Sequence, residues 1–172
     1  MGELKIFGYI LVTVLLLTAI VLPLVEIFFA YRERLILSDA LYNSCRVAAE
    51  DSYNYANMRN INAERREQNF RIRFAEAFEI SFDLTCVDNS AEPLKFTSNS
   101  DAYNDFEVKL AFDIDYIDVN AINGELKTVT YITAAATSPY KFKQRYMQRF
   151  NEEGGINYAL TGVRIYTMVV VN

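Results

Sequence analysis

Residues Ile6 to Val25 read IFGYILVTVLLLTAIVLPLV, a run of twenty residues without a charge. At a rise of 1.5 Å per residue, a helix of this length is about 30 Å long, which matches the hydrocarbon core of a bilayer. Lys5 precedes the run, and Tyr31 and Arg32 follow it after a short second apolar patch. Charged and aromatic flanks of this kind hold a span at both interfaces. We therefore expect residues 1–30 to form one transmembrane helix in contact with membrane lipid.

Two other interpretations fit this apolar run less well. A cleaved secretory signal has a shorter apolar core, about 7–15 residues, and ends at a small-residue cleavage site. The run is longer than that, and no A-x-A pattern lies near its end. A core helix of a soluble protein keeps a polar face, and this run has none. A membrane anchor remains the favoured interpretation.

Composition bounds the rest of the chain. Of 172 residues, 52% are hydrophobic and 23% are charged, which is typical of a folded domain. A net charge of −5 argues against nucleic acid as a partner. The chain has no His, so it lacks the commonest general base and metal ligand, and it contains no phosphate-binding loop or nucleophile motif. Three aspartates do not match the spacing of a calcium loop: Asp113, Asp115 and Asp118. We expect no enzyme, cofactor or metal site.

The helical pattern continues past the apolar run. No Gly or Pro occurs from Ala30 to Met58, and apolar or small residues recur at steps of three and four, at Leu37, Leu41, Cys45 and Ala48. This pattern predicts one helix from about Leu4 to about Asn57. Residues 31–57 would then continue the span into a folded head, residues 31–172.

Two shorter helices and several strands are predicted in the head. The first helix runs from Ala63 to about Glu79, and the second runs from Tyr140 to about Glu152 with Ser138-Pro139 at its start. The expected strands are Ile80 to Cys86, Phe106 to Tyr116, Glu125 to about Ala136, Ile156 to Thr161 and Val163 to Val171. A polar loop from Asp88 to Asp105 would follow the first strand, and a hairpin turn at Asn123-Gly124 would precede the third. Gly162 would join the last two strands. The last strand would be central, or an edge covered by another subunit. The predicted fold class is α+β, with the long helix packed on an antiparallel sheet of about four strands.

Three further features of the sequence bear on packing and assembly, and two of them, the cysteine pair and Glu26, have two readings. Cys45 and Cys86 both fall on predicted apolar faces, so they form either one disulfide or two buried free thiols. Pro23 removes a helical hydrogen bond and is expected to kink the helix. Glu26 stands near the membrane edge, where it either faces water or pairs with a cation of a neighbouring subunit.

The first third of the chain resembles TadE-like proteins, which are pilin-like (pseudopilin) minor components of tight-adherence pilus systems. The similarity is carried by short motifs: Pro23-Leu24-Val25-Glu26, Ala30-Tyr31, Arg34, Leu37, Asp39-Ala40 and Arg46-Val47-Ala48-Ala49. In that family a prepilin peptidase cuts after a Gly, and Gly8 is the candidate here. A Glu often stands five residues after the cut, and this chain has Thr13 there.

The resemblance implies a structural subunit or minor pilin of a type IV-related envelope filament. Its helices, residues 6–30, would associate side by side with other pilin-like subunits, and an assembly platform and a prepilin peptidase would act on it. The expected assembly residues are Glu26, Pro23, Ile6, Leu16 and Phe28. The expected location is the cell membrane, single-pass, with the C-terminal domain extracytoplasmic or in an extracellular filament. The alternative is an anchored protein that binds a partner or ligand without polymerising.

Overall fold

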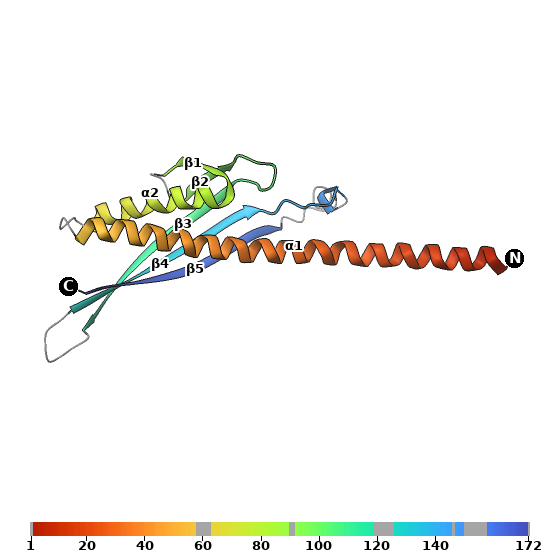
Figure 1. The fold of residues 1–172 in the computed structure, drawn as a ribbon, viewed down its shortest axis with the longest axis horizontal. Coiled ribbons are helices and arrows are strands. Elements are labelled where there is room, and N and C mark those ends of the chain that lie inside the picture. Colours follow the sequence, from red (N-terminus) through yellow and green to blue (C-terminus); the bar gives the residue numbers. More distant parts are fainter. Residues whose placement is uncertain are drawn as a thin grey trace.

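The computed structural model describes residues 2–57, 63–89, 92–118, 126–145, 147–149 and 158–171. It has the predicted α+β architecture, a long helix packed on an antiparallel sheet (Figure 1). The elements are α1 (Gly2–Asn57), α2 (Ala63–Phe82), β1 (Leu84–Asp88), β2 (Leu94–Ser98), β3 (Phe106–Asp118), β4 (Leu126–Pro139) and β5 (Ala159–Val171).

Helix α1 confirms the prediction of one continuous helix. It runs through Pro23 without an interruption of its helical assignment, and the chain does not turn between Val25 and Leu37. Its N-terminal half projects alone, whereas its second half lies along the sheet and α2 (Figure 1). The predicted stripe faces the head, because Leu37, Leu41 and Cys45 are fully buried. Burial of this stripe, rather than helix propensity, holds the second half in place.

The sheet has five strands in the order β1-β2-β3-β4-β5, so each strand pairs antiparallel with its neighbour in sequence. Strands β3 and β4 pair from Glu107↔Thr137 to Asp118↔Leu126, as expected for a hairpin, although Asn123-Gly124 lies outside the described residues. The predicted alternation of β3 is confirmed up to Asp113: Phe106, Val108, Leu110 and, partly, Phe112 face the helices, and the residues between them are exposed.

Helix α2 is longer than predicted, and the strand expected to begin at Ile80 begins at Leu84. Phe82 continues the four-residue series of Phe70, Phe74 and Phe78, and its ring centroid lies 5.4 Å from that of Phe78. The even spacing that suggested a strand is equally a continuation of the helical face, and packing decides for the helix. Asp83 has a φ of 53°, a left-handed conformation that ends helices.

A strand was missed in the stretch from Asp88 to Asp105, which was predicted to be loop throughout. Within it, β2 places Leu94 and Phe96 in the core, with exposed fractions of 0% and 1%. Phe96 meets Phe78 of α2 edge-on, at a centroid distance of 5.1 Å. Two apolar residues in a polar stretch give too short an alternation to mark a strand from sequence. Their burial raises the number of strands from about four to five.

The prediction that Ser138-Pro139 begins a helix is wrong, because both residues end β4. Pro139 pairs with Ala159 beyond the last partner of β3, so its missing N–H breaks no bond to β3. The Tyr140 N–H then donates to the Tyr158 carbonyl at 2.9 Å and prolongs the pairing by one step. The first helical residue described after β4 is Arg145.

Gly162 lies within β5 and does not join two strands, contrary to the prediction. A Cβ at this position would lie 3.1 Å from Leu37 Cγ and 3.2 Å from Leu41 Cδ1. The absent side chain therefore lets α1 pack closely on the strand. Strand β5 is one of the two edge strands of the sheet, and no other strand of the described residues pairs with its open side. Arg34 of α1 donates to the Thr161 carbonyl of this strand at 2.9 Å.

Cys45 and Cys86 are both free thiols, so the structure contains no disulfide between them. Cys45 is fully buried in α1, and Cys86 is half-buried in β1. Burial raises the pKa of the Cys45 thiol to about 12. The pKa of Cys86 is also raised, first by burial and then by the charge of Glu79. Both thiols are therefore protonated at neutral pH and behave as small apolar side chains.

Candidate functional site at the base of the head

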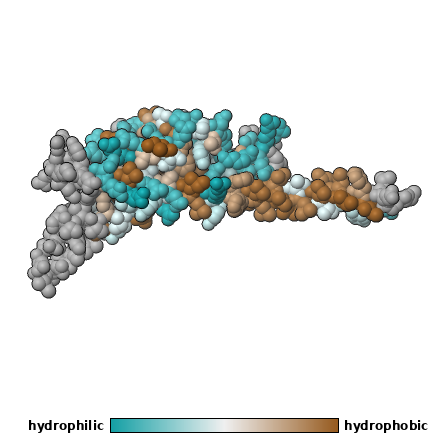
Figure 2. Space-filling view, viewed as in Figure 1, coloured by the Kyte–Doolittle hydropathy of each residue, from teal (hydrophilic) through white to brown (hydrophobic). Residues whose placement is uncertain are grey.

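The N-terminal half of α1 presents an apolar surface that the rest of the chain leaves bare. Between Ile6 and Val25, every large hydrophobic side chain is exposed, from 38% at Leu22 to 75% at Tyr9. The hydroxyls of Thr13 and Thr18 donate to carbonyls of their own helix. By length and composition, α1 is long and apolar enough to cross a membrane. In Figure 2 this half is a hydrophobic rod that extends from a largely hydrophilic head.

Glu26 lies where the bare half ends, and its carboxylate is turned into the head. Its side chain is 1% exposed, and Oε1 accepts hydrogen bonds from the Lys143 backbone N–H at 2.7 Å and from the Tyr140 hydroxyl at 3.2 Å. Neither sequence-based reading of Glu26 describes this position, since the carboxylate faces neither water nor the outside of the subunit. The partners stand more than a hundred residues away in the sequence, so no local pattern could reveal them.

The contacts of Glu26 reduce the electrostatic cost of burying its carboxylate. A buried carboxylate is costly unless it accepts hydrogen bonds, and two donors on Oε1 offset part of that cost. Oε2 is also buried and makes no hydrogen bond to the described residues. Burial, followed by the charge of Glu26, raises the pKa of Tyr140. The phenol therefore stays protonated and keeps donating to the carboxylate well above neutral pH.

The described residues around these donors, 140–145 and 147–149, form a docking segment against α1. Gln144 Nε2 donates to the Leu22 carbonyl at 3.4 Å, and Lys143 Nζ lies 3.0 Å from Glu33 Oε1. The Glu33 side chain is only 12% exposed, so this ion pair is better shielded than an ordinary surface pair. Together with Glu26, these contacts attach the segment to α1 between Leu22 and Glu33.

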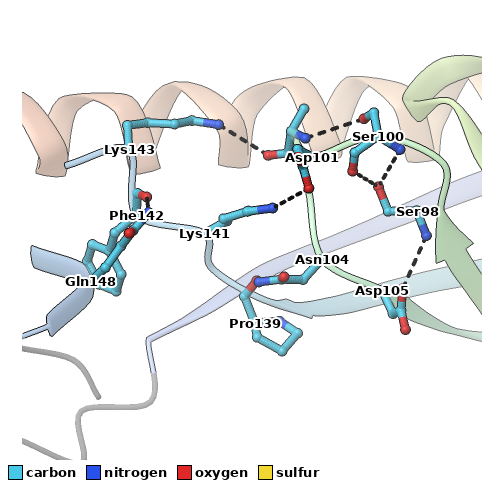
Figure 3. A network of polar contacts seen from close by, with 11 residues as sticks. Ser98, Ser100, Asp101, Asn104, Asp105, Pro139, Lys141, Phe142, Lys143 and Gln148 are labelled. Atoms are coloured by element: carbon cyan, nitrogen blue, oxygen red, sulfur yellow. Dashed lines mark hydrogen bonds and ion pairs between the residues drawn. The ribbon is translucent and has the colours of Figure 1, made fainter. Parts of the chain in front are cut away.

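The loop between β2 and β3 also contacts the docking segment (Figure 3). The Asn104 amide donates to the Pro139 carbonyl at 2.9 Å, and Lys143 Nζ donates to the Ala102 carbonyl at 3.2 Å. Lys141 lies 3.5 Å from Asp101, a fully exposed carboxylate, so this pair contributes little. Within the segment, Gln148 Nε2 donates to the Phe142 carbonyl at 2.7 Å. These contacts hold the described residues that follow β4, 140–145 and 147–149, against the rest of the head.

Aromatic rings fill the space behind the docking segment. The Tyr140 ring meets Phe142 and Tyr158 edge-on, with centroid distances of 5.0 and 5.6 Å. Phe142 is partly buried and packs against the core.

The other predicted assembly residues do not gather with Glu26. Ile6, Leu16 and Phe28 are 60%, 60% and 63% exposed on α1, and Pro23 is half-buried within it. A Cβ at Gly8 would meet nothing within 4 Å beyond the adjacent residues and backbone of its own helix. In the part of the chain that the structure describes, no group of three carboxylates or cysteines could hold a metal ion.

No family model, no curated protein and no solved structure matches the chain.

Proposed function

We propose that the protein is a pilin-like structural subunit, or a minor component, of a Tad-like envelope filament. In this proposal α1 anchors the subunit in the cell membrane and assembles side by side with the α1 helices of other subunits. The observation that supports the proposal is the division of one continuous helix into a bare apolar half and a half packed on the head.

The bare half needs apolar surroundings. Its side chains are large and exposed on every side of the helix, and water in contact with them costs about 25 cal/mol for each Å². Lipid satisfies this surface in the membrane, and neighbouring helices satisfy it in a filament. A rod of this kind suits a subunit that passes from one surrounding to the other.

Glu26 has a different role in this proposal from the one expected from sequence. Since Oε1 is used by Lys143 and Tyr140, the carboxylate fastens the head to the top of the anchor. A head held at a fixed angle gives every subunit the same shape, which a regular polymer requires. Lateral association then depends on apolar residues such as Leu16 and Phe28.

Further parts of the proposal follow from the resemblance to TadE-like proteins. The head would lie outside the cytoplasm, a prepilin peptidase would cut after Gly8, and an assembly platform would receive the processed subunit. The open surroundings of Gly8 are compatible with access by a peptidase once that part of the helix unwinds. The mature N-terminus, measured by mass spectrometry, tests the cleavage.

Cysteine cross-linking tests lateral association. A chain carrying Cys45→Ala and Cys86→Ala receives one new cysteine, either Leu16→Cys in the bare half or Ile80→Cys on α2. Both positions are well exposed, at 60% and 86%. After oxidation of native membranes, we expect disulfide-linked dimers for the Leu16 variant and far fewer for the Ile80 variant, which serves as the matched control. Equal yields would contradict association through the bare half.

The alternative, an anchored protein that does not polymerise, is favoured by one observation. Glu26, the one charged residue near the membrane edge that was expected to pair between subunits, is satisfied within its own chain. Electron microscopy of the detergent-extracted protein separates the two functions. Filaments or lateral oligomers support the first, and monodisperse particles support the second.

A further inference from the structure

The docking segment lies at the level where the apolar run ends. Gln144 bonds to the Leu22 carbonyl, and the Lys143 backbone bonds to Glu26, one turn further along the helix. In Figure 1 the segment, which follows β4, is the part of the head nearest to the bare half of α1. Figure 2 shows hydrophilic residues at this end of the head, next to the hydrophobic rod. If α1 spans a bilayer, these residues stand at the headgroup layer.

The charge of the segment is of one sign. Residues 140–149 read YKFKQRYMQR, with four cations and no acid. Lys141 and Lys143 are paired with Asp101 and Glu33. Arg145 and Arg149 are exposed, and neither makes an ion pair with any described residue. The next acids in the sequence, Glu152 and Glu153, lie outside the described residues.

The arginines and the aromatic rings behind them match the chemistry of a membrane surface. Guanidinium groups bind phosphate oxygens with two parallel hydrogen bonds, and each basic residue near an anionic bilayer adds favourable electrostatic energy. Tyr158, which is 44% exposed, resembles the aromatic side chains that settle at the headgroup level of membrane proteins. An acidic protein would satisfy the charge alone, but it would have to compete with the lipid already present at this height.

We propose that Arg145 and Arg149 bind the phosphate groups of anionic lipids in the bilayer that holds α1. The docking segment thereby rests the base of the head on the membrane surface. This inference depends on the membrane anchoring in the proposed function, but not on polymerisation. Salt weakens the contact, because the arginines are exposed.

An environment-sensitive fluorophore next to the arginines tests the proposal. Met147→Cys in the full-length Cys45→Ala, Cys86→Ala chain is labelled and reconstituted into vesicles of phosphatidylcholine alone or with about 30% phosphatidylglycerol. We expect a blue shift of the emission in the anionic vesicles, and we expect about 0.5 M salt to reverse it. The double variant Arg145→Gln, Arg149→Gln should lose most of that shift. The matched control, Lys95→Gln and Lys109→Gln on the exposed face of the sheet, should keep it.

Three outcomes would overturn the proposal: equal emission in neutral and anionic vesicles, a shift that resists salt, or a double arginine variant that behaves like its parent. Flotation of the same samples separates this failure from a failure of anchoring. A protein that floats with neutral vesicles but shows no dependence on anionic lipid is anchored and does not bind headgroups. A protein that floats with neither vesicle contradicts the anchoring itself, and the inference falls with it.

Discussion

The two halves of α1 share one backbone geometry and differ in what their side chains meet. In the first half, Leu16 is 60% exposed, whereas Leu41 in the second half is completely buried beside Gly162 of β5. The first half therefore depends on its surroundings, and the second depends on the chain itself. The change occurs at Glu26, the first buried residue of α1 from Lys5 onward. A single helix thus belongs to two environments, and each half can be altered separately.

The largest expected difference between the two halves is the effect of truncating a leucine on the stability of the head. Leu41→Ala removes a fully buried side chain, so we expect it to lower the free energy of unfolding of the head by about 2–5 kcal/mol. Leu16→Ala removes a side chain that lies outside the core of the head, so the head should keep its stability. Denaturant titration of the detergent-solubilised full chain, followed by circular dichroism, measures both.

A Leu16→Ala variant whose head loses as much stability as that of Leu41→Ala would show that the halves are energetically coupled. Cross-linking efficiency supplies the reverse control, because substitutions in the bare half should affect association between subunits and leave folding unchanged.

Glu26→Ala should act at the boundary between the halves. It removes the acceptor of the Lys143 N–H and of the Tyr140 hydroxyl, a loss of about 1–3 kcal/mol that is confined to the docking segment. Hydrogen exchange followed by mass spectrometry should show faster exchange in residues 140–149 and unchanged exchange in β3. Tyr140→Phe, which leaves the Lys143 bond intact, should give a smaller increase. Uniformly faster exchange throughout the head would contradict a local role.

The smallest effect concerns the buried thiol of the second half. The pKa of Cys45 is raised from 9.0 to about 12 in the folded chain, so the unfolded chain loses this proton first as the pH rises. The stabilisation is complete below about pH 9, and it declines by roughly 1 kcal/mol between pH 9 and pH 10. Denaturant titrations at pH 8 and 10 should show this decline, and a Cys45→Ala variant should show a shallower one. An identical slope in the variant would refute the assignment to Cys45.

Regular patterns made most of the fold predictable from the sequence. The stripe from Leu37 to Cys45 and the alternation of β3 repeat often enough to fix both elements, and burial follows the repeats. The errors fall where a pattern is short or shared by two structures. Phe82 suits a helix and a strand equally, β2 offers only two apolar positions, and Ser138-Pro139 fits a helix start as well as a strand end.

The site at the base of the head was located only in part. Its position on α1 was predicted at Glu26, since a carboxylate beside an apolar run needs a partner. The partners of Glu26 were not predicted, because Tyr140 and Lys143 lie more than a hundred residues away in the sequence and only the folding of the sheet brings them to it. The role of Gly162 was hidden for the same reason, since its neighbours Leu37 and Leu41 are distant in sequence.

The two edge strands of the sheet, β1 and β5, differ in how well they are protected against pairing with another chain. At β1, the strand is five residues long, its register shifts between Cys86 and Asp88, and the Cys86 amide is occupied by Glu79. At β5, thirteen residues continue in regular register, and Arg34 shields the carbonyl of Thr161. Val163 and Ile165 add exposed β-branched side chains beside this open backbone. An extended peptide could therefore pair with the open edge of β5. The head on its own would stay soluble only if this edge were covered.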